Sequence, residues 1–456
     1  MAGIGFEIRK ILKEDSYLAL LKAYGYAGVI GSGPWALSIL AMLLIGILGV
    51  GMVVPNQQVA QFQVSITHLM LGSLCLSGFL QLAFTRYIAD RLFEKRDKMV
   101  LPSFHGALLV VTLAAGIGGW LFLVLSGSDL SLAYRLLMGV NFVVLNQIWI
   151  ATIFLSGMKC YKQIVRLYAL GYALSVGCSL GLHKLGLEGL LGGFLIGQFV
   201  LLAGMMIFIM RTYPSDHFIS FDFLRRGRMY RSLIWTGFFY NLGVWIDKLI
   251  FWYLPSLGQQ VIGPLHASVL YDVPIFLAYL SIIPGMAVFL VRMETDFVEF
   301  YAKFYDAVRD GGTLQYIEDM RDELVRTARQ GNFEIMKVQT IAVLVGFVAG
   351  PALLRVLGIS ELYVNLLYVD SVAAGLQVVL LGILNVYFYL DKRFATICLC
   401  AGFTVLNAAL TLVSIAMGPV FYGYGFAVAM LLSVLIGMTI LDRRLDRLEY
   451  ETFMLR

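Results

Sequence analysis

The residues of this 456-residue chain that could do chemistry lie inside long apolar stretches. Asp247 and Lys248 stand in the middle of one such stretch, and Asp272 and Asp370 stand in two later ones. A charge at the centre of a bilayer costs about 2.5–3.5 kcal/mol on insertion scales, so such residues usually mark a substrate or ion pathway. Neighbouring helix positions point about 100° apart, which predicts that Asp247 and Lys248 face different neighbours.

Aromatic and amide side chains accompany this pair of charges. Tyr240 shares a helical face with Asp247, whereas Asn241 and Trp245 line up with Lys248. Flat aromatic rings suit the apolar faces of sugar rings, and Asn and Tyr can reach sugar hydroxyls. A purely structural ion pair with Asp272 or Asp370 is the alternative. The predicted substrate pathway comprises Tyr240, Asn241, Trp245, Asp247, Lys248, Asp272 and Asp370.

Other kinds of chemistry find no support in the sequence. The five histidines are never spaced four residues apart, the five cysteines contain no CxxC pair, and no GxSxG or nucleotide-binding motif occurs. The sequence therefore predicts no catalytic residue, no metal site and no cofactor, and we expect a protein that is not an enzyme. No compact basic domain lies outside the apolar stretches, so nucleic acid is not an expected partner.

The apolar stretches themselves predict membrane helices. Hydrophobic residues make up 60% of the chain and the mean hydropathy is +0.82, well outside the range of soluble proteins. A bilayer core about 30 Å thick takes roughly 20 residues of helix to cross. The predicted fold is all-α, with twelve transmembrane helices in two six-helix bundles. These spans cover 35–54, 60–85, 102–126, 131–157, 164–184, 188–210, 232–254, 266–291, 336–358, 363–390, 394–417 and 420–441.

The positive charges predict the orientation of these spans. The chain has 34 Lys and Arg, and all fall in alternate gaps between spans except Arg135, Lys184, Lys248 and Arg355. Positive charge is enriched on the cytoplasmic side of membrane proteins, which places both termini in the cytoplasm.

The gaps also divide the chain into segments. We expect an amphipathic, interfacial N-terminus over 1–34, closed by glycines and Pro34 that break the chain before the first span. One bundle covers 35–210, a cytoplasmic linker covers 211–231, and a second bundle covers 232–441. Pro274 and Pro284 should kink the eighth helix, in the second bundle, twice. In the first bundle, glycine ladders such as Gly189/Gly193/Gly197 and Gly177/Gly181 should allow close helix packing. A cytoplasmic tail covers 442–456.

A helical insert at 292–335 is the longest cytoplasmic segment. It carries ten acidic and six basic residues, a net charge of −4. Aromatic residues recur at helical spacing along its first part, Gly311 and Gly312 then break the helix, and Thr313 could cap the next one. The insert is interpreted either as local structure packed under the bundle or as a docking site for a cytoplasmic partner. The predicted docking residues are Phe297, Phe300, Phe304, Asp319 and Glu323.

Three segments resemble one known family: GIGFEIRKIL at 3–12, YAGVIGSGPW at 26–35 and VRMETDFVEFYAKFYDAV at 291–308. The chain resembles the PelG family, the inner-membrane transporters of the Pel exopolysaccharide machinery. The family belongs to the multidrug/oligosaccharidyl-lipid/polysaccharide flippase superfamily, which implies two six-helix bundles. It also implies a bacterial inner-membrane location and export of an amino-sugar polymer for the biofilm matrix. The implied partners are the exopolysaccharide chain, a cytoplasmic glycosyltransferase, and membrane scaffold proteins that include a cyclic di-GMP receptor.

Two other functions remain open from the residues alone. An ion-coupled antiporter of drugs or small molecules would use Asp247 or Asp370 as its coupling site and would need no partner. A membrane-embedded sugar polymerase or ligase would be expected to carry catalytic residues on a sizeable external loop, and the predicted external loops are all short. For the exporter, we expect that Trp245→Ala and Asp247→Asn reduce secretion while the protein remains inserted and stable.

Overall fold

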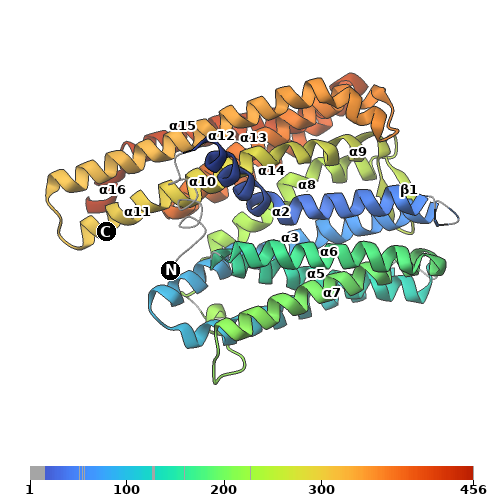
Figure 1. Ribbon diagram of the computed structural model, residues 1–456, viewed down its shortest axis with the longest axis horizontal. Helices are drawn as coiled ribbons and strands as arrows, with labels where there is room; N and C mark the ends of the chain where they lie inside the picture. Colours follow the sequence, from blue (N-terminus) through green and yellow to red (C-terminus); the bar gives the residue numbers. More distant parts are fainter. Residues whose placement is uncertain are drawn as a thin grey trace. The chain divides into compact units, whose positions relative to one another are not determined.

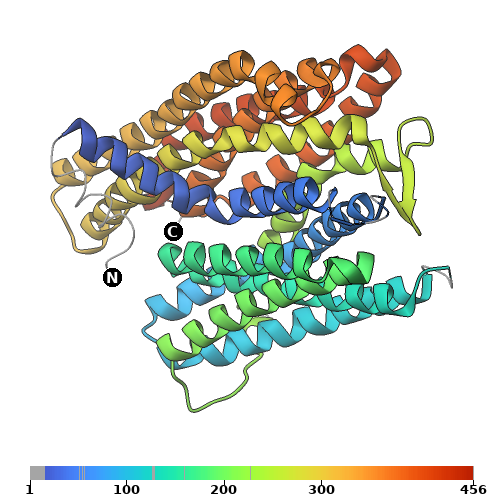
Figure 2. The same ribbon diagram turned by 45° about the vertical axis from the view of Figure 1, so that its right-hand side comes forward.

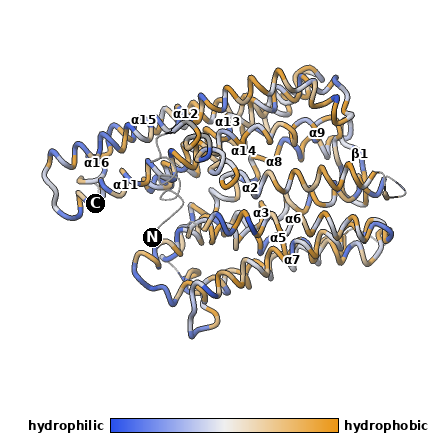
Figure 3. Tube along the Cα trace, in the orientation of Figure 1, coloured by the Kyte–Doolittle hydropathy of each residue, from blue (hydrophilic) through white to orange (hydrophobic). Residues whose placement is uncertain are grey.

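The computed structural model (Figure 1) describes residues 16–50, 52–53, 55, 57–125, 129–158, 160–225 and 227–454. Within these ranges, eleven helices are long and apolar enough to cross a membrane. Hydrophobic residues line the middles of the helices, and hydrophilic residues gather towards their ends (Figure 3). The prediction of a helical, multi-pass membrane protein is confirmed, whereas the count of twelve spans stays a prediction.

One compact unit comprises residues 34–268, here called the 34–268 unit. Within it, α3 packs against α5 and α8, α5 also contacts α4 and α7, and α6 packs along α7. Large aromatic side chains such as Phe62, Phe84 and Phe154 fill its core. Its elements are α2 from Pro34 onward (α2, Tyr17–Val50), α3 (Gln57–Phe93), η1 (Asp97–Met99), α4 (Val100–Leu125), α5 (Leu132–Gly157), α6 (Tyr161–Gly181), η2 (His183–Leu185), α7 (Gly186–Thr212), η3 (Asp222–Leu224), α8 (Arg231–Tyr253), β1 (Gln259–Ile262) and β2 (Leu265–Ala267).

The second compact unit comprises the described residues of 1–33 and 269–456, here called the 269–456 unit. Its central helix is α13, which packs against α9, α12 and α15. Its elements are the first part of α2, α9 (Val269–Ala278), η4 (Tyr279–Ile282), α10 (Ile283–Val291), the π-helical turn η5 (Arg292–Phe297), α11 (Val298–Arg309), α12 (Leu314–Val356), η6 (Glu361–Tyr363), α13 (Val364–Tyr389), α14 (Arg393–Met417), η7 (Pro419–Phe421), α15 (Tyr424–Leu445) and α16 (Leu448–Met454).

The first helix differs from its prediction. The predicted break before residue 35 is wrong, because α2 runs without interruption from Tyr17 to Val50 with Pro34 inside it. In a membrane no water competes for backbone hydrogen bonds, so a helix persists through glycine and proline. The glycines serve packing instead: a Cβ on Gly31 would lie 3.0 Å from the carbonyl oxygen of Met286 in α10. Most of the predicted interfacial segment, residues 1–15, lies outside the described residues.

The helix α8 occupies the position of the predicted seventh span but is not among the eleven apolar helices. Its contacts group it with α3 in the 34–268 unit, whereas the predicted second bundle began at residue 232. The six-plus-six division therefore stays a prediction. After α8 the chain forms a short antiparallel hairpin of β1 and β2, drawn as arrows in Figure 2, which occupies residues predicted as an external loop and the start of the eighth span.

The predicted eighth helix changes from α-helical hydrogen bonding at the 3-10 turn η4, whereas kinks at Pro274 and Pro284 stay a prediction. The 3-10 turn η4 separates α9 from α10, and Pro284 lies in the first turn of α10. Pro274 lies inside α9, which continues to Ala278. The π-helical turn η5 follows, and it joins α10 to the helices of the insert.

Glycine packing is confirmed between α6 and α7. A Cβ on Gly193 would lie 2.2 Å from the backbone nitrogen of Ser179, and one on Gly197 would lie 2.4 Å from the backbone nitrogen of Ser175. The second predicted ladder is wrong, because nothing lies within 4 Å of a Cβ built on Gly177 or Gly181. These two glycines lie on a face of α6 that no described neighbour approaches.

Two antiparallel helices form the insert, as its breaker and capping residues predict. Gly311 adopts a positive φ of 70° between α11 and α12, and the Thr313 hydroxyl accepts a hydrogen bond from the Tyr316 backbone. From there α12 extends unbroken for 43 residues, which covers the second part of the insert and most of the predicted ninth span. The C-terminal residues fold onto it: Arg329 of α12 forms ion pairs with Asp442 and Asp446.

Candidate functional site

Two glycines position α8 for the candidate site. A Cβ on Gly237 would lie 2.3 Å from the carbonyl oxygen of Gly78 in α3, so only glycine permits this approach of the two backbones. Asn241 sits one turn further along α8 and donates a hydrogen bond from Nδ2 to the Gly237 carbonyl at 3.1 Å. Its amide lies beside the crossing point, where a Cβ on Gly78 would come within 2.7 Å of it.

The charged pair lies about three turns beyond this crossing. Asp247 and Lys248 are 0% and 1% exposed, so both charges are withdrawn from solvent inside the 34–268 unit. The Lys248 ammonium lies 3.2 Å from Oδ2 of Asp247 and donates to the Val244 carbonyl at 2.9 Å. It also lies 5.6 Å from the centre of the Trp245 ring, within cation–π range.

The structure adds a contact between these two charges that the sequence prediction did not include. Their Cα–Cβ bonds do diverge around the helix, but the long Lys248 side chain folds back along α8, and its ammonium reaches the carboxylate of Asp247. The prediction considered partners on other helices and omitted a pair between the two neighbours. A buried pair of this kind offsets part of the desolvation cost of each charge.

A cluster of aromatic and imidazole rings lies at the end of α8. The His68 ring of α3 lies 4.5 Å from the Trp252 ring, and its Nε2 lies 3.5 Å from the Tyr253 hydroxyl. His68 Nδ1 bonds to the Val64 carbonyl at 2.9 Å, and since a carbonyl only accepts, this nitrogen carries the hydrogen. His266 of the hairpin completes the cluster, with its ring 5.0 Å from that of Tyr253.

His68 also borders a cavity of about 190 Å³ among α3, α4 and α5. Glycines create this space: Gly118, Gly119 and Gly139 all line it. Its remaining walls are apolar, so His68 supplies the polar group. The cavity is smaller than the roughly 300–1,000 Å³ of ordinary ligand sites, and it cannot by itself be a passage for a polymer.

The predicted pathway residues fall into buried and accessible sets. Trp245, Asp247 and Lys248 are buried, whereas Tyr240 and Asn241 are partly exposed. Asp272 and Asp370 belong to the 269–456 unit. Asp272 is half-buried on α9, and Asp370 is fully buried on α13, where a Cβ on Gly423 would lie 3.0 Å from its Oδ1.

An accessible aromatic cluster lies nearer the start of α8. Phe79 of α3 stacks on Phe238 at 4.3 Å and meets the edge of Trp235 at 5.6 Å. Trp235 is 48% exposed, and Phe238 and Phe79 are partly buried. The concentration of aromatic residues in this helix was the signal in the sequence, although the predicted site included Trp245 and left Trp235 out.

The predicted docking residues also fall into a buried set and an exposed set. Phe297 and Phe304 are 0% exposed, and Phe297 packs edge-on against Tyr389 of α13 at 5.6 Å. These two rings, at the end of η5 and in α11, are buried within the 269–456 unit, which supports the interpretation as local packing. Phe300 is half-buried under Lys303, Asp319 is exposed, and Glu323 pairs with Arg326.

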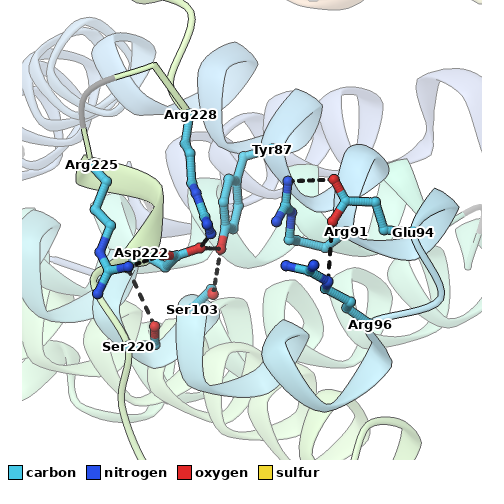
Figure 4. Close-up of polar contacts among 9 residues, drawn as sticks. All are labelled: Tyr87, Arg91, Glu94, Arg96, Ser103, Ser220, Asp222, Arg225 and Arg228. Carbon is cyan, nitrogen blue, oxygen red and sulfur yellow. Dashed lines mark hydrogen bonds and ion pairs between the residues drawn. The ribbon is translucent and has the colours of Figure 1, made fainter.

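Sequence reasoning missed a polar cluster in the 34–268 unit (Figure 4). Asp222, only 7% exposed, accepts a hydrogen bond from the Tyr87 hydroxyl at 3.1 Å and forms ion pairs with Arg225 and Arg228. The Ser103 hydroxyl lies 3.3 Å from that of Tyr87. Asp222, three residues before the first of the arginines at 225–228, was the signal, but those arginines were interpreted only as markers of orientation.

A second missed cluster surrounds η5. Arg292 forms ion pairs with Asp296 at 2.8 Å and with Glu334 of α12 at 2.5 Å, and Asn385 of α13 donates to Glu294 at 2.9 Å. Single-turn π-helices often occur at functional sites. Among the described residues, no group of three or more His, Cys, Asp or Glu side chains is arranged to hold a metal ion.

Comparison with known proteins gives the family. The family model PelG, described as "Putative exopolysaccharide Exporter (EPS-E)", matches residues 1–453. The chain belongs to the PelG family. The resemblance in the three sequence segments is therefore confirmed. A search of curated proteins finds no match.

Solved structures similar to this PelG-family chain are transporters of one superfamily. One is described as the outward-facing conformation of a multidrug resistance MATE family transporter of the MOP superfamily, with a TM-score of 0.68, 14% identity, and coverage of 94% of this chain and 96% of that one. Another is a MOP superfamily transporter from Pyrococcus furiosus, with a TM-score of 0.63, 14% identity, and coverage of 94% and 96%. A MATE structure in a straight conformation has a TM-score of 0.64, 14% identity, and coverage of 93% and 97%. The chain has a MATE-like transporter fold.

Proposed function

We propose that this PelG-family chain exports an amino-sugar exopolysaccharide of the Pel type across the bacterial inner membrane. In this proposal twelve helices cross the membrane, both termini lie in the cytoplasm, and the chain catalyses no reaction itself. The observation that carries the proposal is the family match over residues 1–453. The MATE-like fold, which belongs to transporters, supports it.

The accessible aromatic cluster on α3 and α8 supplies the chemistry that a sugar polymer needs. The rings of Phe79, Trp235 and Phe238 present flat apolar faces, and partly exposed Tyr240 and Asn241 add a hydroxyl and an amide. Such surfaces bind sugars weakly and repeatedly, which suits a chain that must keep moving. The buried Asp247–Lys248 pair then fixes the helix that carries them.

Secretion by complemented cells tests this route. A strain lacking the chain is supplied with the Trp235→Ala variant, and extracellular polysaccharide is measured together with the amount of the variant in the membrane. We expect a severalfold loss of polymer at a normal protein level. Trp120→Ala is the matched control, because Trp120 of α4 is 64% exposed and belongs to no ring cluster described above. Equal secretion by both variants would remove the aromatic cluster from the route.

We also propose that a cytoplasmic glycosyltransferase docks on the exposed acidic side of α12 and feeds the growing polymer to the exporter. Burial of Phe297 and Phe304 moves the proposed contact away from them and towards Asp319 and Asp322, whose side chains face outward. Scaffold proteins, including a cyclic di-GMP receptor, would complete the assembly. Polymer elongation would then push the chain outward, so no nucleotide site is needed on the exporter.

A pull-down from native membranes tests the docking. The double variant Asp319→Lys/Asp322→Lys should lose the glycosyltransferase, whereas Asp216→Lys, a change at a side chain 89% exposed in the other unit, should keep it. Deletion of the whole segment would be a poorer test, because Arg321 and Arg329 of α12 hold the C-terminal helices by ion pairs. Recovery of the enzyme with the double variant would exclude this surface.

An ion-coupled antiporter remains the second candidate, because one similar structure is a multidrug transporter and this chain buries Asp247 and Asp370. Purified protein in proteoliposomes distinguishes the two functions. Efflux of a cationic dye driven by a sodium or proton gradient, without any partner, would support antiport. No gradient-driven efflux, together with loss of polymer from the Trp235→Ala strain, would support export.

A further inference from the structure

The segment between α7 and α8, residues 213–230, is here called the α7–α8 linker and is described apart from residue 226. Its residues 215–220 are attached to η1 and to the start of α4. The Ser215 hydroxyl donates to the Lys98 carbonyl at 2.7 Å, and the Ser220 backbone donates to the Pro102 carbonyl at 2.9 Å. His105 Nδ1 bonds to the Phe218 carbonyl at 2.7 Å. The contact is close, because a Cβ on Gly106 would lie 2.2 Å from the Ser220 carbonyl oxygen.

These contacts set the depth of the linker along the membrane helix. The 26 residues of α4 measure about 39 Å at 1.5 Å per residue, about 9 Å more than a bilayer core. Charged residues 95–98 lie just before α4, whereas α4 itself contains no Asp, Glu, Lys or Arg, so we expect its first few residues at the level of the lipid headgroups. Since Pro102 and Gly106 fall within the first two turns, we expect the linker at the boundary between headgroups and acyl chains.

The short turn η3 fixes which side chains face outward. Phe223 is 0% exposed and packs against Phe84 at 5.5 Å, and Asp222 is held by Tyr87 and two arginines. The residues on either side point away from the unit: Phe221 is 43% exposed and Leu224 is 48% exposed. Earlier in the linker, Phe218 is 78% exposed, the largest exposure of an apolar side chain among the described linker residues.

Positive charge accompanies these apolar side chains. Residues 86–98 and 211–231 together contain ten Lys and Arg and five Asp and Glu, so their net charge is +5, the same as that of the whole chain. Arg225 and Lys98 are 73% and 83% exposed, at the polar edge of the contact with α4. Aromatic side chains beside exposed basic residues are the composition that binds anionic membrane surfaces.

We propose that the α7–α8 linker is a binding site for anionic phospholipids, with Phe218, Phe221 and Leu224 inserted at the acyl boundary and Arg225 and Lys98 on the phosphates. Both ends of the linker continue into helices α7 and α8, so a bilayer is the surface already beside it. A folded protein partner would have to displace lipid to reach Phe218. The site is independent of the cargo that the protein exports.

Spin labelling measures the depth of the linker directly. The full chain, with its five cysteines replaced by alanine, carries a nitroxide at Phe218→Cys or at Leu314→Cys and is reconstituted in bilayers of phosphatidylcholine with phosphatidylglycerol. Leu314 is the matched control, because it is 69% exposed in the acidic insert. We expect the label at 218 to collide with oxygen and to be shielded from a water-soluble nickel complex, and the label at 314 to behave in the opposite way. Equal access of the nickel complex to both labels would overturn the proposal and leave a soluble partner as the occupant.

The retention of lipid by the purified protein tests the proposed contact between Arg225 and anionic phospholipids. The ratio of phosphatidylglycerol to phosphatidylcholine that stays with the detergent-purified protein is measured by mass spectrometry. Arg225→Gln should lower this ratio at least about twofold, and Arg326→Gln, at a side chain 70% exposed on α12, should leave it unchanged. An unchanged ratio for Arg225→Gln would overturn the proposed contact. Loss of phosphatidylglycerol on addition of inorganic phosphate would overturn it too, since it would show a site for free anions.

Discussion

The ammonium group of Lys248 lies 3.2 Å from the carboxylate of Asp247, its neighbour in the chain, and neither residue is more than 1% exposed. Removing one member of a buried ion pair takes away a compensating charge from the other, at a cost of about 3–5 kcal/mol. We therefore expect Asp247→Asn and Lys248→Met each to lower the thermal stability of the protein in detergent, and the double variant to lose less than the sum of the two.

Secretion by the double variant then distinguishes a structural role of the Asp247–Lys248 pair from a role in transport. If the pair contributes to the pathway, Asp247→Asn/Lys248→Met should reach a normal level in the membrane and still secrete less polymer. Normal secretion at a normal level would assign the pair a structural role only. This comparison replaces the single Asp247→Asn change expected from the sequence to leave the protein stable.

Trp245→Ala should destabilise the protein rather than act on transport alone. Trp245 is 4% exposed, its ring lies 6.3 Å from that of Trp252, and truncation of a buried tryptophan costs about 3–5 kcal/mol. Trp245→Phe should retain most of the stability. Thermal unfolding of both variants in detergent is the measurement, and an unshifted midpoint for Trp245→Ala would contradict the burial described above.

The crossing of α3 and α8 gives a test by a single methyl group. Gly237→Ala places a Cβ where the Gly78 carbonyl lies 2.3 Å away, so the two backbones must separate, at a cost of about 1–3 kcal/mol. Gly116→Ala is the control, because nothing lies within 4 Å of its added methyl. A lower unfolding temperature is expected for Gly237→Ala alone, and equal temperatures would argue against the close crossing.

The C-terminal helix α16 should respond to pH through Glu451. Burial raises the pKa of this carboxyl, but hydrogen bonds and charge from Lys392 and Arg444 outweigh burial and hold the pKa below its ordinary value of 4.5. A carboxyl with a lowered pKa stabilises the fold at any pH above 4.5, and this contribution is lost as the pH falls from 4.5 through the folded-state value.

The measurement is the unfolding temperature of Glu451→Gln relative to the parent protein across that range. The variant should be less stable at neutral pH, and the difference should shrink below about pH 4. Asp310→Asn, at a side chain 70% exposed in the turn after α11, serves as the control. A difference that stays constant with pH would mean that the two ion pairs of Glu451 do not stabilise α16.

Hydropathy predicted the helices well where a span is apolar and its ends are polar. The span predicted at 131–157 is α5, Leu132–Gly157, and the span at 363–390 is α13, Val364–Tyr389. The start of α2 was predicted wrongly from its helix-breaking residues, because glycine and Pro34 end helices in water but not in a membrane. Thr313 and Gly311 were predicted correctly, since capping and a positive φ depend on local residues.

The site was less predictable, because it depends on which residues meet in space. Nothing in the spacing of Gly78 and Gly237 shows that their backbones touch, and helical geometry alone gives no sign that Lys248 folds back onto Asp247. The helical spacing of aromatic residues along α11 was predicted correctly. From the sequence, however, these rings could equally have faced a partner or α13. Only the packing of Phe297 on Tyr389 decides between these.

The course of α2 has a consequence for biosynthesis. Its first half belongs to the 269–456 unit, where Gly28 and Gly31 lie against Ile283 and Met286 of α10. These partners follow more than half a chain length later, so a ribosome must complete most of the protein before the first helix can find its place. Until α10 has been synthesised, the first half of α2 lies in the bilayer without its final partners. Its glycines allow a close contact with α10 to form late. They also leave this part of α2 with little side-chain surface for binding other helices.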